Sequence, residues 1–237
     1  MALRALEFFI LHSTFVIRHS SFLLPMRFLI TAGPTREPID PVRFISNRSS
    51  GKMGYAIAEA AIEAGHQVVL VSGPVCIAPP AGARVIGVTT SEEMFNAVHA
   101  NLDGIDIAVL CAAVADFKPA KFSREKIKKH HGLENIPLTP TRDILASLGK
   151  IKKNFLLAGF AAETESLAEN AKKKLREKQC DVIVGNDVSR MDTGMESDDN
   201  EVVMFFKTGE TLALPGEKKI TLAKKLVKIF AQHAEKC

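Results

Sequence analysis

Six short segments of this chain supply, between them, the glycines, polar side chains and cations that anion-binding loops use. Glycine lets a ligand approach the backbone, arginine can bind a carboxylate or phosphate through two hydrogen bonds, and lysine adds positive charge. These features together indicate a site for small anionic molecules. The segments cover residues 31–38, 40–54, 111–117, 126–129, 159–164 and 184–187.

The segment at residues 40–54 ends where a helix is predicted to begin. Free N–H groups and the helix dipole make such an N-terminus an anion site. The G-x-x-x-x-G-K-[ST] spacing of a P-loop is absent. Arg43 and Asn47 lie four residues apart and offer a charged fork and an amide. Further donors or positive charge come from Ser49, Gly51 and Lys52.

The other segments leave two readings open. Asp116 could hold a metal ion or a ribose hydroxyl, or could cap a helix. Phe160 could stack on a base or belong to the core. Lys174 and Lys178 lie one helical turn apart, and this helix face could either bind phosphates or face solvent. The lysine run at 126–129 likewise either closes over phosphates or faces solvent.

Apolar periodicity predicts the elements that position these loops. Helices are expected at residues 52–64, 143–148, 165–178 and 218–234, and Ser91 is expected to cap another. A hairpin is expected around Gly209, from residues 200–206 and 211–214. This alternation predicts an α/β, doubly wound, mostly parallel sheet with helices on both faces and a small C-terminal hairpin. Ligands then bind beyond the carboxyl ends of the strands. Strands are expected at residues 27–32, 67–72, 106–111, 154–160 and 181–184.

Composition narrows the class of protein. The chain has 237 residues, 46% of them hydrophobic, and a net charge of +4, which suits a globular domain at residues 26–237. One tyrosine and no tryptophan disfavour a nucleic-acid platform. Four cysteines without a C-x-x-C pair indicate reduced thiols in the cytoplasm. Residues 1–25 are too interrupted for a membrane span or signal peptide; we expect a spurious or disordered extension before a true start at Met26.

Taken together, the motifs resemble one enzyme family. ITAGPTREPIDPVRFISNRSSGKMG, AAVADF, EKIKK, GFAAET and VGND, in this order from about Arg27 to the C-terminus, are similar to phosphopantothenate–cysteine ligases. The resemblance implies a stand-alone, Rossmann-like homodimer that joins 4′-phosphopantothenate to L-cysteine in coenzyme A synthesis. It implies CTP as co-substrate (ATP being possible), Mg²⁺, and no flavin. The acid would first attack the nucleotide α-phosphate, and the cysteine amine would then displace the nucleoside monophosphate.

The resemblance also implies residue roles. Asn47, Arg43 and Lys126 resemble the catalytic residues, and Asp116 is a possible metal ligand. The family commonly has proline where this chain has Arg142, whose side chain could contact phosphate or face solvent. The implied substrate-binding residues are Gly33, Asn47, Ser49, Gly51, Lys52 and Asn186. The implied nucleotide-binding residues are Leu110, Cys111, Ala112, Asp116, Lys126, Arg142, Asp143, Ile144, Leu145, Phe160, Lys174 and Lys178.

Two alternatives remain from the residues alone. A short-chain reductase with a nicotinamide cofactor would need a glycine-rich fingerprint and a Tyr-x-x-x-Lys pair, but Tyr55 is followed by Glu59. A non-catalytic nucleotide-binding domain would keep the fold and lose turnover.

Overall fold

A computed structural model describes residues 24–128, 135–151, 154–187 and 197–235. The predicted extension at residues 1–25 therefore lies, except for its last two residues, outside the described residues, as does the last lysine of the run at 126–129. Within the described part of the chain, no helix is both long and apolar enough to cross a membrane.

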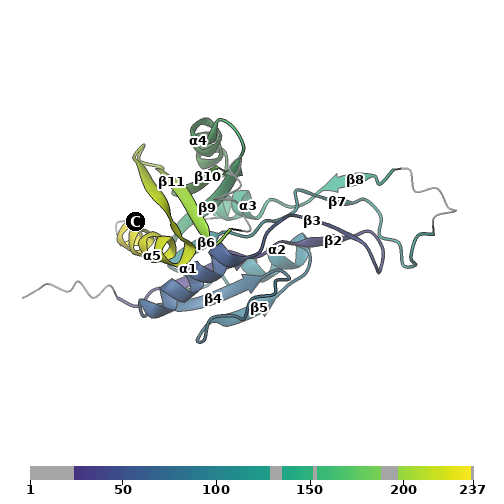
Figure 1. Ribbon diagram of the computed structural model, residues 1–237, viewed down its shortest axis with the longest axis horizontal. Helices are drawn as coiled ribbons and strands as arrows, with labels where there is room; N and C mark the ends of the chain where they lie inside the picture. Colours follow the sequence, from purple (N-terminus) through teal and green to yellow (C-terminus); the bar gives the residue numbers. More distant parts are fainter. Residues whose placement is uncertain (1–23, 129–134, 152–153, 188–196, 236–237) are drawn as a thin grey trace, which may run out of the picture.

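The centre of the fold is one eight-stranded sheet, and the predicted α/β, Rossmann-like architecture is confirmed (Figure 1). Its order is β12-β11-β10-β9-β6-β1-β4-β5, with parallel pairing from β5 to β10 and antiparallel pairing of β11 and β12. The predicted hairpin thus extends the main sheet. The strands are β1 (Arg27–Ala32), β4 (Gln67–Ser72), β5 (Arg84–Gly87), β6 (Ile107–Leu110), β9 (Leu156–Glu163), β10 (Val182–Asp187), β11 (Asp199–Phe206) and β12 (Thr211–Lys218).

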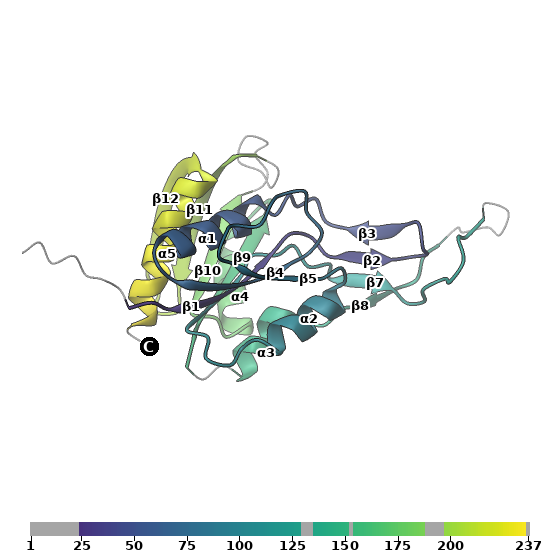
Figure 2. The ribbon, with the colours of Figure 1, turned by 90° about the horizontal axis from the view of Figure 1, so that it is seen from below.

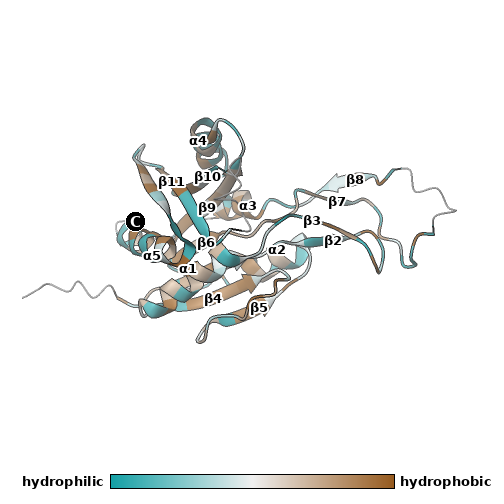
Figure 3. Cartoon of the chain, in the orientation of Figure 1, coloured by the Kyte–Doolittle hydropathy of each residue, from teal (hydrophilic) through white to brown (hydrophobic). Residues whose placement is uncertain are grey.

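Helices cover both faces because the central strands are apolar on both sides. In β1, Phe28 and Ile30 pack with α1 (Lys52–Glu63) and α5 (Lys219–Ala234), whereas Leu29 packs in the opposite cluster. That second cluster contains α2 (Ser91–His99), α3 (Ile144–Ile151) and α4 (Leu167–Glu177). Figure 3 shows the middle of β4 in apolar colours. Burial of two faces explains why these strands read as uninterrupted apolar runs.

The prediction that Ser91 caps α2 is wrong by one residue. Thr90 is the N-cap: its side chain accepts the Glu93 N–H, and Glu93 bonds back to the Thr90 N–H. This reciprocal capping box satisfies two backbone donors, whereas a cap at Ser91 would satisfy one. Ser91 instead begins the helix, and its N–H donates to the buried Glu37 carboxylate at 2.8 Å.

Two small ribbons extend from the carboxyl edge of the sheet, and neither was predicted (Figure 2). One pairs β2 (Arg36–Pro38) with β3 (Phe44–Ser46), and the other pairs β7 (Phe117–Pro119) with β8 (Leu138–Pro140). We call these four strands, the turn at residues 39–43 and the segment at residues 120–128 the arm. Strands of three residues are too short for a periodic signal, so only the folded chain reveals the arm.

Candidate active site

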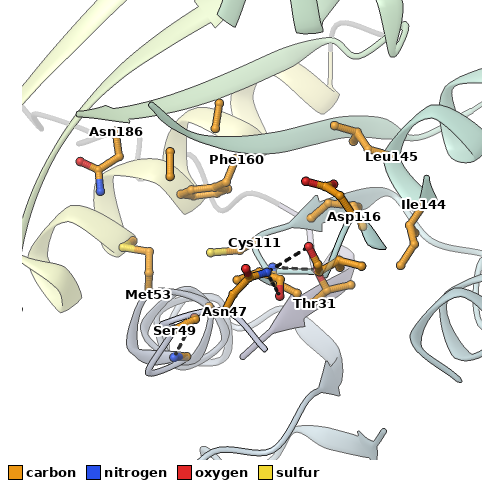
Figure 4. A pocket seen from close by; sticks show the side chains of 18 of the residues that line it. Thr31, Asn47, Ser49, Met53, Cys111, Asp116, Ile144, Leu145, Phe160 and Asn186 are labelled. Carbon is orange, nitrogen blue, oxygen red and sulfur yellow. Dashed lines mark hydrogen bonds between the residues drawn. The ribbon is translucent and has the colours of Figure 1, made fainter. Parts of the chain in front are cut away.

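A cavity of about 700 Å³ lies at the carboxyl edge of the sheet, where ligands bind in folds of this class. It is lined from the ends of β1, β6, β9 and β10, from the N-terminus of α1, and from the loop before α3. Figure 4 shows side chains from these elements around one space, with Asn47, Cys111, Asp116 and Phe160 among them. Loops far apart in the sequence therefore form a single site.

Asn47 follows the arm strand β3 and is held by the backbone of another loop. Its Nδ2 donates to the carbonyls of Ala113 at 3.0 Å and Val114 at 3.1 Å, as the dashed lines in Figure 4 show. The loop of Ala113 is itself tied to the loop after β1, because Thr35 N–H donates to the Ala113 carbonyl at 3.2 Å. These bonds use both amide hydrogens and leave Oδ1 as the acceptor that Asn47 can offer to a ligand.

The N-terminus of α1 forms a second wall. Gly51 caps the helix with φ 78°, a left-handed conformation that favours glycine. Tyr55 N–H makes the first intrahelical bond, to the Gly51 carbonyl at 3.1 Å, so the N–H groups of residues 52–54 precede the helical ladder. No acidic residue lies in this first turn, and Lys52 lines the cavity. The terminus is therefore suited to an anion.

Three buried polar side chains line the cavity from β10, β11 and α5. Asn186 is 9% exposed, and its buried Oδ1 has no partner among the described residues. Asn200 and Lys219 are buried beside it in the lining. Burial first, and the charge of Lys52 second, lower the pKa of Lys219 below its ordinary value. A bound anion would relieve both effects and could use the Asn186 amide as a donor.

The cavity lining also includes two lysines, each held by a carboxylate. Lys174 Nζ donates to Glu163 at 2.9 Å, and Lys178 Nζ donates to Asp143 Oδ2 at 2.6 Å. Burial acts to raise the pKa of Asp143, but hydrogen bonds from Ala146 N–H and Lys178 lower it overall. The Asp143 bond raises the pKa of Lys178. The lysines are thus fixed at the cavity, and their positive charge is partly neutralised.

Arg142 lines the cavity, but its side chain is held against α2. It forms an ion pair with Glu92, donates to Asn96 Oδ1 at 3.0 Å, and lies 3.6 Å above the centre of the Phe95 ring. Proline at this position would lack all three contacts. The side chain is 48% exposed, and it also ties the loop before α3 to α2.

Cys111 and Asp116 follow β6 on the cavity wall. Burial raises the pKa of the Cys111 thiol to about 12, although the charge of Lys219 acts in the opposite direction, so this thiol is a poor nucleophile. Asp116 is exposed. The described residues contain no group of three or more His, Cys, Asp or Glu side chains that could hold a metal ion.

The chain matches the family model of the DNA/pantothenate metabolism flavoprotein C-terminal domain over residues 23–233. The chain belongs to this family. It is 46% identical over 204 residues to the Coenzyme A biosynthesis bifunctional protein CoaBC of Bacillus subtilis (strain 168), covering 86% of this chain and 50% of that protein. It is 44% identical over 216 residues to the protein of the same name in Escherichia coli (strain K12), covering 89% and 53%.

The chain thus spans about half the length of these curated relatives. A crystal structure of the C-terminal domain of CoaBC is similar with a TM-score of 0.79 at 42% identity, covering 92% of this chain and 100% of that one. The family resemblance drawn from the motifs is therefore confirmed.

Most of the residues predicted from the family motifs meet in the cavity. Gly33, Arg43 and Lys126 are not among its described lining residues. Gly33 instead supports the loop after β1, where its carbonyl accepts the Ala113 N–H at 2.9 Å. Arg43 and Lys126 belong to the arm. The predicted residues that do line the cavity are Asn47, Ser49, Gly51, Lys52, Leu110, Cys111, Ala112, Asp116, Arg142, Asp143, Ile144, Leu145, Phe160, Lys174, Lys178 and Asn186.

Several lining residues were missed from the sequence. Lys219 follows another lysine at the start of α5, and Asn200 lies within β11, so neither stands in a recognisable motif. Antiparallel pairing of β11 with β10 brings this region to the cavity. Thr31, Arg48, Met53 and Thr141 also line it. Thr31, Arg48 and Met53 lie within the first motif quoted for the family, and Thr141 directly precedes Arg142, so these positions were the signal that could have found them.

The structure gives the reductase alternative no support. Tyr55, the one tyrosine of the chain, is 7% exposed, and its hydroxyl is 3.0 Å from Ser72 Oγ. It packs in the core between α1 and the sheet, and cannot serve as an acid in the cavity.

Proposed function

We propose that this chain joins 4′-phosphopantothenate to L-cysteine through an acyl-nucleotidyl intermediate, as a step of coenzyme A synthesis. The observation that carries the proposal is the cavity, in which Asn47 faces the same space as the anion-binding α1 N-terminus and the Asp143–Lys178 pair. Family membership and the names of the relatives give this arrangement its chemical direction.

The reaction has two steps. A carboxylate oxygen of 4′-phosphopantothenate attacks the α-phosphorus of the nucleotide, and the bond from that phosphorus to pyrophosphate breaks. The cysteine amine then attacks the acyl carbon, gives up one proton to solvent, and displaces the nucleoside monophosphate. The protein contributes by orienting two anions that repel each other in water and by directing N–H groups and cations at the phosphates.

The residues divide between these tasks. Asn47 Oδ1 would accept a hydrogen bond from the pantothenoyl group. Because the Asn47 Nδ2 is bonded to two backbone carbonyls, the side chain would hold the pantothenoyl group in a fixed position. The backbone of residues 110–112 and the ring of Phe160 would hold the base. The α1 N-terminus, with Asn186, and the pair of Lys174 and Lys178 would bind phosphates. CTP is the proposed nucleotide, with ATP as the second candidate.

Magnesium fits the donor set in a limited way. Mg²⁺ in nucleotide sites is usually held by one or two carboxylates together with phosphate oxygens and water. Asp116 lines the cavity as an exposed carboxylate and would be the protein's ligand. When bound, the ion would offset negative charge on the phosphate oxygens.

A homodimer is part of the proposal. Exposed large apolar side chains gather on the arm, where a partner could cover them. Arg43 and Lys126 also belong to the arm, and we propose that Arg43 acts in the cavity of a second copy. The exposed side chains are Val42, Phe44, Phe117, Phe122 and Leu138, each 48–59% exposed.

Mixing two inactive variants tests both the site and the dimer. Asn47→Asp damages the cavity, and Arg43→Ala damages the arm. If the arm acts across the dimer, half of the re-assorted dimers are mixed and each has one intact site, so mixing should restore about a quarter of wild-type pyrophosphate release. No recovery would refute the action across the dimer.

Omitting substrates tests the reaction class. Pyrophosphate release should require 4′-phosphopantothenate and a nucleoside triphosphate with magnesium, and amide formation should also require cysteine. Oxidation of NADPH would support the reductase, and tight nucleotide binding without any release would support a non-catalytic domain. Cytoplasmic location belongs to the same proposal, since thiols such as the free Cys76, Cys111 and Cys180 persist there.

A further inference from the structure

Asp40 is a buried carboxylate at the tip of the arm. It follows β2, and its side chain is 0% exposed. Oδ1 accepts the N–H groups of Val42 at 2.9 Å and Arg43 at 2.8 Å. Oδ2 accepts Arg43 Nε at 3.0 Å, Arg43 Nη2 at 2.5 Å and the Ile127 N–H at 3.2 Å. One oxygen therefore closes the turn, and the other joins an arginine side chain to a distant segment.

That segment carries Lys126 and is fastened to the arm tip at two further points. Arg43 Nη2 donates to the Ile127 carbonyl at 2.9 Å, and Ser123 N–H donates to the Ile39 carbonyl at 3.0 Å. Lys126 thus lies between two anchored residues. Arg43 and Lys126, which are 83 positions apart in the chain, are parts of one hydrogen-bonded unit.

The charge of Asp40 suits this role. The Arg43 guanidinium beside it, against the opposing effect of burial, holds the pKa of the Asp40 carboxyl well below its usual range. Asp40 is therefore ionised at neutral pH. Its bonds to the guanidinium are charge-assisted, and they are stronger than bonds between neutral groups. Arg43 still exposes 42% of its side chain, so it can be oriented by Asp40 and also contact a ligand.

We propose that Asp40 is a positioning residue for the reaction: its Oδ2 holds Arg43 and the segment of Lys126 together, so that both cations reach the reacting groups as one unit. This inference rests on the proposed function for the roles of Arg43 and Lys126. Asp40 itself touches no substrate. The tether is a property of the folded chain and can be measured without turnover.

Asp40→Asn is the variant that tests the tether. An amide keeps one oxygen for the turn but replaces Oδ2 by an N–H₂ group, which faces the donors of Arg43 and Ile127. Glu37→Gln is the matched control, since Glu37 is a buried carboxylate of the same arm that bonds to Ser91 in α2 and not to residues 123–128.

Hydrogen exchange on the full-length protein gives the first readout. In Asp40→Asn, the amides of residues 123–128 should exchange at least about tenfold faster, because a charge-assisted hydrogen bond that protects them is lost. Peptides of β1 and β6 should stay protected. Glu37→Gln should leave residues 123–128 unchanged. Equal exchange in Asp40→Asn and wild type would overturn the proposal. If Asp40→Asn does not fold, Arg43→Lys read by exchange makes the same test, since an ammonium lacks the fork that bridges Asp40 and Ile127.

A double-mutant cycle gives the second readout. Asp40→Asn should lower kcat about 10- to 100-fold in the wild-type background. The factor should be clearly smaller when Lys126→Ala is already present, because coupled residues are not additive and only the contribution through Arg43 is then left to lose. Multiplicative effects would show that Asp40 does not act through the Lys126 segment. A wild-type protein without pyrophosphate release would refute the proposed function, and the exchange experiment would still decide the tether.

Discussion

Gly73 has no room for a side chain, and replacing it tests how the loops around Asn47 are supported. It follows β4, and a Cβ added there would lie 1.9 Å from the Pro34 carbonyl oxygen and 2.8 Å from its carbon. Both atoms are backbone atoms, which cannot rotate away. Gly73→Ala must therefore push the two loops apart by about 1 Å or more to reach an ordinary contact distance.

The cost in stability follows from this displacement. Overpacking of this kind costs about 1–3 kcal/mol. Alanine also restricts the unfolded chain, which offsets about 0.4–1 kcal/mol. We therefore expect the free energy of unfolding to fall by about 1–2 kcal/mol.

The displacement should also reach the site. Pro34 forms a bridge with Ala113, and the Ala113 carbonyl accepts the Asn47 amide at 3.0 Å. Moving Pro34 therefore moves the group that orients Asn47. Because a misplacement of about 1 Å can cost about 100-fold in rate, we expect kcat/KM to fall about 10- to 100-fold.

Guanidinium denaturation followed by circular dichroism measures the first effect, and pyrophosphate release measures the second. Gly87→Ala is the control, since no heavy atom lies within 4 Å of a Cβ built at Gly87 and its unfolding free energy should change by less than about 0.5 kcal/mol. If Gly73→Ala matches this control in both stability and rate, the packing argument fails.

Three further predictions concern the cavity lining. Asn186→Ala removes an amide whose buried Oδ1 lacks a described partner, so the free energy of unfolding should change by less than about 1 kcal/mol. The KM for the nucleotide should rise about 10-fold. An unchanged KM would show that Asn186 does not bind the nucleotide. The pKa of Asp143 is lowered, so its ion pair with Lys178 should stabilise the folded protein at neutral pH. Because both side chains are partly exposed, the pair contributes under about 1 kcal/mol. This contribution should be lost as the pH falls below about 4. A stability difference between Asp143→Asn and wild type that grows in acid would contradict this sign. Iodoacetamide at about pH 8 should alkylate the exposed Cys76 at least about tenfold faster than the partly exposed Cys111, because the pKa of the Cys111 thiol is about 12. Equal rates would contradict this raised pKa.

The sequence predicted the central strands because they are buried on both faces. Residues 27–32 and 67–72 are almost uninterrupted apolar runs, and both became strands with the expected bounds. The strand at residues 84–87 was missed because it lies at the sheet edge with most of its residues exposed. Edge strands carry no continuous apolar pattern.

The site was predictable where it lies in local motifs. Asp116 follows β6 and Phe160 lies in the second half of β9, so the topology of the parallel sheet brings these two together, and Asn47 lies in the polar motif that leads into α1. Lys219 joins them because β11 of the hairpin pairs antiparallel with β10, a pairing that no local pattern encodes. The contact of Arg142 with α2 was equally hidden, since it depends on how α2 and the loop before α3 pack.

Isotope transfer tests the central idea, that one cavity sets a carboxylate oxygen against a nucleotide α-phosphate. 4′-Phosphopantothenate labelled with ¹⁸O in its carboxylate is incubated with protein, CTP, magnesium and cysteine, and the masses of the products are measured by mass spectrometry. We predict that one labelled oxygen appears in CMP, because the acyl carbon–oxygen bond breaks in the second step. CMP without label, or label in inorganic phosphate, would contradict the mechanism.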